Sequence, residues 1–221
     1  MSSANTFFER AEKLIKQLEA LFALPEQEEI GDGIAWRWRV TGDRKRLEEI
    51  TRFAELQLND LLHIDKQKSE LERNTKQFLS GLPANNALLW GPRGTGKSSL
   101  VKALLNRYSS EGLKLVEVEK SELKDLPEIV DRIRSFKHQF VIYCDDLSFD
   151  ADDSSYRGLK SVLDGSVLET PNNIIIYATS NRRHLVPEYQ NDNQHSQVVG
   201  GEIHHSEAVE ERISLSERFG L

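Results

Sequence analysis

Hydrophobic residues near the start of the chain recur at helical spacing. Between residues 7 and 22, apolar side chains fall every three or four positions, which predicts an amphipathic helix. The following stretch "GDGIAWRWRV" alternates apolar with small or basic residues, and it predicts a short strand or hairpin arm. A long polar helix is predicted from about Asp65 to Leu79. We therefore expect an N-terminal extension over residues 1–58 and a main domain over residues 59–221.

Buried strands alternate with helices through the rest of the chain. Strands are predicted from "NALLW", "LKLVEVE", "QFVIYCDD" and "NIIIYATSN", and the segments between them have the length and spacing of helices. Strands joined by helices in this way lie parallel and are connected by right-handed crossovers. The apolar runs in the strands are continuous, as expected for strands that are covered on both faces. The sequence predicts an α/β fold with three layers and a parallel sheet.

The charge balance restricts the classes of partner. Among its 221 residues the chain has 29 Lys and Arg against 36 Asp and Glu, a formal net charge of −7. This balance argues against extensive non-specific nucleic-acid binding, which needs a basic surface, although it allows a local basic patch. No apolar run approaches the roughly 18 residues of a spanning helix, and the N-terminus lacks the basic-then-apolar order of a signal peptide. With Cys144 as the single cysteine, we expect a cytoplasmic protein without membrane association.

A glycine-rich loop follows the strand "NALLW". Its sequence "GPRGTGKS" matches the phosphate-binding P-loop pattern in full. Glycines let backbone N–H groups converge on phosphate oxygens, and the helix that begins at Lys97 adds the positive end of its dipole. Lys97 is expected to reach the β- and γ-phosphates of a nucleotide, and the Ser98 hydroxyl is expected to bind Mg²⁺. The predicted nucleotide-binding residues are Gly91, Pro92, Arg93, Gly94, Thr95, Gly96, Lys97, Ser98 and Ser99.

Two aspartates end the strand "FVIYCDD". Open α/β sheets bind ligands at the carboxyl ends of their strands, so Asp145 and Asp146 are candidates for the chemistry. Asp145 would hold Mg²⁺ directly or through water, and Asp146 would orient and deprotonate the attacking water. At the second position of such an acidic pair, which Asp146 occupies here, the usual residue is glutamate, whose side chain is longer than that of aspartate by one methylene. The alternative is a surface acidic pair that begins a turn.

The strand "IIIYATSN" ends in a short amide side chain. If this strand lies between the strands "NALLW" and "FVIYCDD", Asn181 would lie beside the γ-phosphate of the nucleotide. It could then hold the attacking water or sense the γ-phosphate. The alternative is an ordinary turn residue, because asparagine is common where strands end.

Other residues have competing interpretations. Trp36 and Trp38, interleaved with arginines, could stack on nucleic-acid bases, but packing of the indoles on the core fits the strand pattern better. His204 and His205 adjoin glutamates and could bind a metal, although a polar loop is the simpler interpretation. Cys144 lies on a buried strand and is expected to act as a small hydrophobe rather than as a nucleophile.

Taken in order, the motifs resemble those of the AAA+ ATPases. "GPRGTGKS" resembles Walker A, "VIYCDD" Walker B and "ATSN" sensor 1, and "SERFG" follows them; the resemblance extends over roughly residues 30–221. The chain is similar to a bacterial branch of predicted AAA+ ATPases whose members are mostly of unassigned function. The resemblance implies that His63 and Ile64 pack against the adenine and that Arg218 is an arginine finger. It also implies that the fifth strand of the sheet and the helical lid are missing, because the chain ends at Leu221.

The resemblance implies ATP and Mg²⁺ as cofactors and ATP hydrolysis as the reaction. Such a module would work as a homo-oligomer when full length and would remodel a protein or nucleic-acid client that the sequence does not identify. One alternative is a P-loop kinase that passes the γ-phosphate to a small molecule and therefore needs an acceptor site. The other is a nucleotide switch that does not hydrolyse ATP, which is favoured if Asp146 cannot act as a base.

Overall fold

The computed structural model describes most of the chain, namely residues 30–149, 156–164, 171–182, 185, 197–199, 202–204 and 215–221. The chain divides into two compact units, Met1–Gly31 and Asp32–Leu221, and the central sheet belongs to the second. The helix expected over residues 7–22 lies outside the described residues. Within the described stretches, no helix has both the length and the apolar character needed to span a bilayer.

Strands and helices alternate along the second unit in the predicted order. The helix predicted from Asp65 to Leu79 forms over those residues. In chain order the elements are β1 (Ala35–Thr41), β2 (Arg44–Glu49), η1 (Leu58–Asp60), α2 (Asp65–Leu79), β3 (Ala87–Trp90), α3 (Lys97–Tyr108), η2 (Ser109–Glu111), β4 (Leu113–Glu117), η3 (Lys120–Asp125), α4 (Leu126–Ile133), β5 (Gln139–Cys144), α5 (Tyr156–Leu163), β6 (Ile174–Ser180), β7 (Gln197–Val199) and β8 (Glu202–His204).

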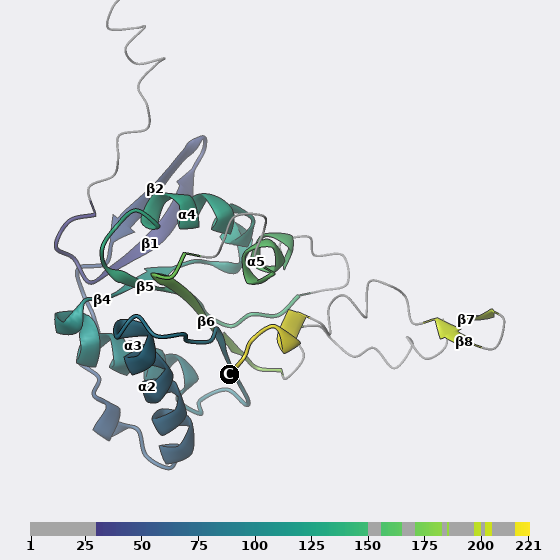
Figure 1. Ribbon diagram of the computed structural model, residues 1–221, viewed down its shortest axis with the longest axis horizontal. Coiled ribbons are helices and arrows are strands. Elements are labelled where there is room, and N and C mark those ends of the chain that lie inside the picture. Colours follow the sequence, from purple (N-terminus) through teal and green to yellow (C-terminus); the bar gives the residue numbers. More distant parts are fainter. Residues whose placement is uncertain are drawn as a thin grey trace, which may run out of the picture. The chain divides into compact units, whose positions relative to one another are not determined.

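The central sheet has six strands in the order β2-β1-β4-β5-β6-β3 (Figure 1). All neighbouring strands pair in parallel except β1 and β2, which form an antiparallel hairpin. Cys144 pairs with Ala178, and Leu89 pairs with Thr179, so β3, β5 and β6 end at the same edge of the sheet. Because β6 lies between β5 and β3, the condition for placing Asn181 at the candidate site is met.

The hairpin of β1 and β2 belongs to the central sheet rather than to a separate extension. Trp36 of β1 pairs in parallel with Val116 of β4, and the compact unit begins at Asp32. The domain boundary expected after residue 58 is therefore wrong. Alternating polarity reveals a strand, but it does not reveal which sheet the strand joins.

Both tryptophans of the hairpin lie in the core. Trp36 and Trp38 are 3% and 1% exposed, respectively. Trp38 Nε1 donates a hydrogen bond of 3.1 Å to the carboxylate of Asp125, and the Trp36 ring lies 6.5 Å from that of Phe140 between centroids. Side chains buried to this extent cannot stack on nucleic-acid bases, so the core interpretation is confirmed.

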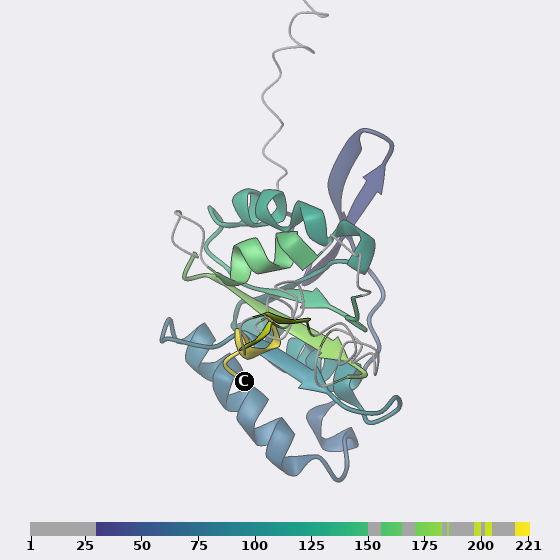
Figure 2. The ribbon, with the colours of Figure 1, turned by 90° about the vertical axis from the view of Figure 1, so that its right-hand side faces the viewer.

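Helices cover both faces of the sheet, with α2 and α3 on one side and α4 and α5 on the other (Figures 1 and 2). Alternate residues of β5 face the two helical layers, as the pleat requires. Val141 and Tyr143 pack in the cluster that includes Leu104 of α3, whereas Phe140 and Ile142 are buried outside that cluster. The predicted three-layer α/β fold is confirmed.

β3 is an edge strand of the sheet. Its last residue, Trp90, is 55% exposed, so the expectation that "NALLW" is covered on both faces is wrong for its carboxyl end. The outer edge of β3 pairs with Leu221, whose N–H donates to Asn86 O at 3.3 Å and whose carbonyl accepts from Leu88 N at 2.8 Å. That the rest of a fifth strand and a lid are missing stays a prediction.

Candidate functional site

The phosphate-binding loop joins β3 to α3 at the carboxyl edge of the sheet. Gly94 and Gly96 have φ angles of 77° and 85°, a left-handed conformation that costs glycine little and other residues more. Gly96 is also the N-cap of α3, so the loop turns directly into the helix. The first N–H groups of α3 therefore lie at the loop, where anions are stabilised by free donors and by the helix dipole.

Lys97 is held at the loop by three oxygen acceptors. Its Nζ donates to the carbonyl oxygens of Gly91 and Pro92 at 2.8 Å each, and it lies 3.4 Å from Oδ1 of Asn181. An ammonium group has three donors, and these three acceptors match them. Phosphate oxygens could replace the neutral acceptors and would form stronger, charge-assisted bonds. Lys97 therefore contacts both the start of the loop that follows β3 and the residue that follows β6.

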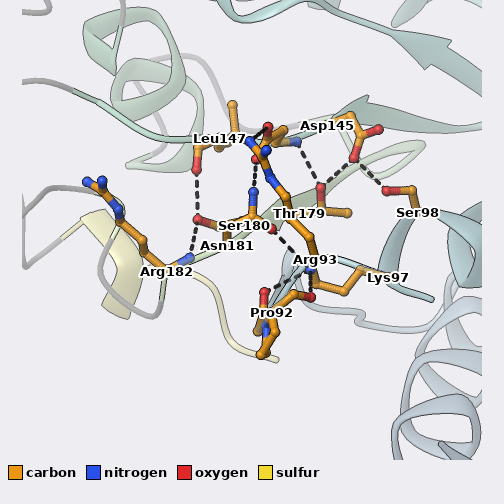
Figure 3. A network of polar contacts seen from close by, with 12 residues as sticks. Pro92, Arg93, Lys97, Ser98, Asp145, Leu147, Thr179, Ser180, Asn181 and Arg182 are labelled. Carbon is orange, nitrogen blue, oxygen red and sulfur yellow. Dashed lines mark hydrogen bonds and ion pairs between the residues drawn. The ribbon is translucent and has the colours of Figure 1, made fainter. Parts of the chain in front are cut away.

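A shared carboxylate oxygen joins α3, β5 and β6 (Figure 3). Ser98 Oγ donates to Asp145 Oδ1 at 2.8 Å, and Thr179 Oγ1 donates to the same oxygen at 2.5 Å. Burial by itself would raise the pKa of Asp145, but hydrogen bonds, that from Thr179 foremost, outweigh it and hold this pKa below its ordinary value. Asp145 is therefore an ionised carboxylate at neutral pH.

Asp146 is turned away from Asp145 by a left-handed backbone with φ of 52°. Its N–H donates to Thr179 Oγ1 at 2.9 Å. Its carboxylate accepts a hydrogen bond from Asn181 Nδ2 and lies 3.5 Å from the Arg93 guanidinium. The two aspartates at the end of β5 consequently face different partners and can have different roles.

Thr179 is the site residue that sequence reasoning missed. Its hydroxyl donates to Asp145 and accepts from the backbone of Asp146, and its side chain is 1% exposed. The motif "ATSN" contained the signal, but only Asn181 was assigned a role in it. The bridging role of Thr179 depends on the pairing of β5 with β6, which no local pattern contains.

These residues surround one pocket of about 340 Å³, near the lower end of the size range of small-molecule sites. The residues that line it are Arg93, Gly94, Thr95, Gly96, Lys97, Ser98, Ser99, Asp145, Asp146, Thr179 and Asn181. Gly91 and Pro92 are not among them, and instead supply the carbonyls that hold Lys97. A cavity of about 630 Å³ lies elsewhere, between residues 53–59, α2 and α3.

The donor set around Asp145 fits Mg²⁺. The cation prefers one or two carboxylates, phosphate oxygens and several waters over a cage of protein ligands. Asp145 offers an ionised carboxylate, and the Ser98 hydroxyl lies 2.8 Å from it. In the part of the chain that the structure describes, no group of three or more His, Cys, Asp or Glu could hold a metal alone. The possible cluster around His204 and His205 lies outside the residues whose side chains are described.

The two residues expected at the adenine lie before α2, outside the lining of the pocket. Ile64 is the N-cap of α2, and its Cδ1 is 3.8 Å from the position that a Cβ on Gly96 would take. Ile64 therefore lies against the phosphate-binding loop. His63 is exposed and has a φ of 63°. Contact with an adenine stays a prediction for both.

Arg218 is not brought to the pocket of its own chain. It forms an ion pair with Asp164, the residue after α5. The segment that follows Arg218 reaches the amino end of β3, where Leu221 pairs with Asn86 and Leu88. The phosphate-binding loop leaves the opposite end of that strand. The predicted finger and the predicted phosphate site thus lie at opposite edges of the sheet.

Cys144 has no part in the site. Its side chain is fully buried, and burial raises the pKa of its thiol to about 12. A thiol that stays protonated is a poor nucleophile. The expectation of a small hydrophobe is confirmed.

Part of the chain is similar to large subunits of replication factor C. It is 37% identical over 68 residues to that of Ignicoccus hospitalis, 33% over 86 residues to that of Staphylothermus marinus and 29% over 137 residues to that of Aeropyrum pernix. These matches cover 30%, 38% and 59% of this chain but only 14%, 20% and 28% of the relatives. The chain thus spans less than a third of the length of these curated relatives.

Two solved structures are similar to this chain, each at 18% sequence identity. A crystal structure of DnaI has a TM-score of 0.46 and covers 75% of this chain and 85% of its own. The Aeropyrum pernix ORC1 protein in complex with DNA has a TM-score of 0.44 and covers 54% and 39%. Both TM-scores are too low to carry a functional argument.

The sequence similarities agree with the geometry at the level of a nucleotide-binding AAA+ module. The P-loop sequence, the paired strand ends and the local identity to replication factor C subunits all support it. The model of the family DUF815, which has the description "Protein of unknown function", matches residues 32–221. Since this match covers most of the chain, the protein belongs to the DUF815 family.

Proposed function

We propose that the protein binds ATP with Mg²⁺ and hydrolyses it as an AAA+ module. The observation that carries this proposal is the convergence of Lys97, Ser98, Asp145, Asp146 and Asn181 around one pocket. These side chains come from the start of α3, directly after the loop that follows β3, and from the ends of β5 and β6. Cation, hydroxyl, carboxylates and amide are the groups that phosphoryl transfer to water requires.

Three of these residues suit the nucleotide and its metal. Lys97 would exchange its carbonyl acceptors for phosphate oxygens, while the free N–H groups at the start of α3 bind the remaining phosphate charge. Ser98 and Asp145 would hold Mg²⁺, which neutralises the charge that develops on the transferred phosphoryl group. The low pKa of Asp145 supports this role, because the carboxylate does not have to lose a proton before it binds the cation.

The other two residues suit the attacking water. The carboxylate of Asp146 is 57% exposed and accepts a hydrogen bond from Asn181, so both can reach a molecule in the pocket. Asp146 would accept the proton of the water, and Asn181 would fix the direction of attack. Arg93 is 84% exposed and pairs with Asp146, and it would turn to the γ-phosphate when the pocket fills.

Arg218 is proposed to act on the nucleotide of a neighbouring subunit. Its place at the opposite edge of the sheet from its own P-loop supports a role in trans rather than in cis. A guanidinium beside a γ-phosphate stabilises the charge of the transition state and contributes about 10³- to 10⁵-fold in rate. The proposal includes a homo-oligomer of the full-length protein that remodels a protein or nucleic-acid client in the cytoplasm.

Two other functions compete with hydrolysis. A P-loop kinase would pass the γ-phosphate to a small-molecule acceptor, and a nucleotide switch would bind ATP without turning it over. The contact of Asn181 with Asp146 favours hydrolysis, because it places two water-binding groups together at the phosphate pocket. Turnover of ATP with and without an acceptor separates the three functions. A hydrolase releases phosphate without an acceptor, a kinase transfers the γ-phosphate only to an acceptor, and a switch turns over almost no ATP.

The experiment compares Asp146→Asn with the parent protein in MgATP binding and in phosphate release. We expect the variant to bind MgATP and to turn it over slowly. Asp131→Asn is the matched control, because Asp131 is 64% exposed and pairs with Arg134 at 3.4 Å, much as Asp146 pairs with Arg93. If Asp146→Asn releases phosphate at the parent rate, Asp146 is not the base. If the parent binds MgATP without releasing phosphate, hydrolysis is ruled out, and the kinase and the switch remain.

A further inference from the structure

The segment that carries Arg218 is packed into the fold on both sides of this residue. Leu215 and Phe219, which flank it, are 1% and 8% exposed, respectively. Leu221 forms two backbone hydrogen bonds with the amino end of β3. The backbone at Arg218 therefore has little freedom to move, and what the residue can reach depends on where its side chain points.

Asp164 meets Arg218 at the carboxyl end of α5. Its N–H donates to the carbonyl oxygen of Lys160 at 2.8 Å, so it continues the hydrogen-bond pattern of the helix. The negative end of the helix dipole disfavours a carboxylate at this place and favours a cation. Asp164 therefore does not stabilise α5 through the dipole, whereas its ion pair with Arg218 gives the carboxylate a counter-ion. What Asp164 contributes thus depends on its contact with Arg218.

The ion pair engages one side of the Arg218 guanidinium. It joins Nη1 of Arg218 to Oδ1 of Asp164, and the two side chains are 34% and 30% exposed, respectively. A guanidinium has five N–H donors on three nitrogen atoms, so it can bind a carboxylate on one side and phosphate oxygens on another. Arg218 can therefore stay on Asp164 while it meets a phosphate from outside its own chain.

An ion pair of this kind affects the orientation of the arginine more than the stability of the fold. Partly exposed ion pairs contribute little to the free energy of unfolding, and the buried side chains of Leu215 and Phe219 already fix the segment. A free arginine side chain, by contrast, loses much rotamer freedom when it binds, and one that is already held loses less. Loss of Asp164 should therefore change a rate rather than a stability.

We propose that Asp164 positions the Arg218 guanidinium for the γ-phosphate of a neighbouring subunit. This inference rests on the proposed role of Arg218 in trans. Asp164 acts through Arg218 and does not touch the nucleotide, because phosphate repels its carboxylate, which binds the guanidinium from the other side. The complete site would then combine the P-loop and the ends of β5 and β6 of one subunit with the Arg218–Asp164 pair of the next.

The test measures kcat and KM for ATP hydrolysis by the full-length protein, at a protein concentration where the rate per subunit no longer rises. Asp164→Asn keeps the shape of the side chain and removes its charge. We expect it to lower kcat about two- to fivefold, the range of an exposed ion pair. KM for ATP and unfolding by urea should stay as in the parent, and Asp164→Glu should restore part of kcat because it restores the charge.

Two controls separate positioning from a structural role. Asp131→Asn removes the charge of another exposed aspartate, which pairs with Arg134 at 3.4 Å, and it should keep the parent kcat. Asp164→Asn is also combined with Arg218→Ala, where it should have no further effect, because Asp164 acts through Arg218. A structural role of Asp164 would lower kcat in both backgrounds.

The outcomes distinguish this inference from the proposed function on which it rests. If Arg218→Ala loses hydrolysis but Asp164→Asn keeps or raises the parent kcat, the positioning role is overturned and the role of Arg218 in trans is unaffected. The same holds if Asp164→Asn lowers kcat equally with and without Arg218. A parent protein that does not hydrolyse ATP, or an Arg218→Ala variant that does so at the parent rate, overturns the proposed function and this inference with it.

Discussion

Thr179→Val removes one hydroxyl and tests how the two aspartates of β5 are organised. Thr179 Oγ1 donates to Asp145 Oδ1 at 2.5 Å and accepts from Asp146 N at 2.9 Å. Valine has nearly the same shape, so the variant loses both hydrogen bonds without leaving a cavity. The hydroxyl is the strongest of the hydrogen-bonding partners that lower the pKa of Asp145, and that pKa should rise in the variant.

The expected loss of stability follows from these two bonds. A hydrogen bond to a charged group contributes about 1.5–3 kcal/mol, and solvent screening of the exposed Asp145 carboxylate argues for the lower end. Loss of the bond to Asp146 N adds less, because Asp146 is exposed and water can reach it. We therefore expect Thr179→Val to lower the free energy of unfolding by about 2 kcal/mol.

The assay is urea unfolding at neutral pH, combined with carboxyl NMR of Asp145 and titration with MgATP. Thr179→Ser is the control, because it keeps the hydroxyl and loses only a methyl group, worth about 0.8 kcal/mol. Valine should destabilise more than serine, raise the pKa of Asp145 and weaken MgATP binding. The reasoning is refuted if the two variants are equally stable and the pKa of Asp145 is the same in both.

Three further predictions concern packing, pH and subunit contacts. Gly158→Ala should destabilise by about 1–3 kcal/mol in urea unfolding, although alanine favours helices, because its Cβ would lie 2.0 Å from the carbonyl oxygen of Leu123; a gain in stability would contradict this. Burial would raise the pKa of Asp125, but hydrogen bonds from the β1–β2 hairpin lower it below 3.8. The stabilisation by Asp125 is therefore complete above pH 3.8 and is lost as the pH falls through the folded-state pKa. Acid unfolding that is identical in Asp125→Asn and the parent would contradict this. Arg218→Ala should bind ATP without hydrolysing it, and mixing with Lys97→Ala should restore part of the activity; mixed assemblies without any rescue would contradict a role in trans.

The sequence was most informative where chemistry depends on neighbours along the chain. The P-loop pattern placed Lys97 and Ser98 correctly at the start of α3, and the continuous apolar run before Asp145 identified the end of a buried strand. Such local patterns carry their own geometry, because a strand, a glycine turn and a helix follow one another directly. The helical and strand segments were predicted for the same reason.

What could not be predicted depends on which strands become neighbours. The sequence did not show that β6 lies between β5 and β3, so this position was only a condition for placing Asn181 at the site. The bridging role of Thr179 follows only from that position. The hairpin was assigned to an extension, since nothing in "AWRWRV" shows that Trp36 pairs beside β4. Trp90 was expected to be buried because apolar composition does not distinguish an edge strand from a central one.

The most direct test of nucleotide binding at the P-loop is titration of a fluorescent ATP analogue into the parent and Lys97→Ala. Lys97 Nζ has three acceptors at the loop, and losing its charge-assisted bonds to phosphate implies a loss of about 1.5–3 kcal/mol, on the order of tenfold or more in affinity. Circular dichroism should be unchanged, and Lys66→Ala should bind like the parent. Equal affinity of folded Lys97→Ala and the parent would contradict the assignment of this pocket to nucleotide phosphates.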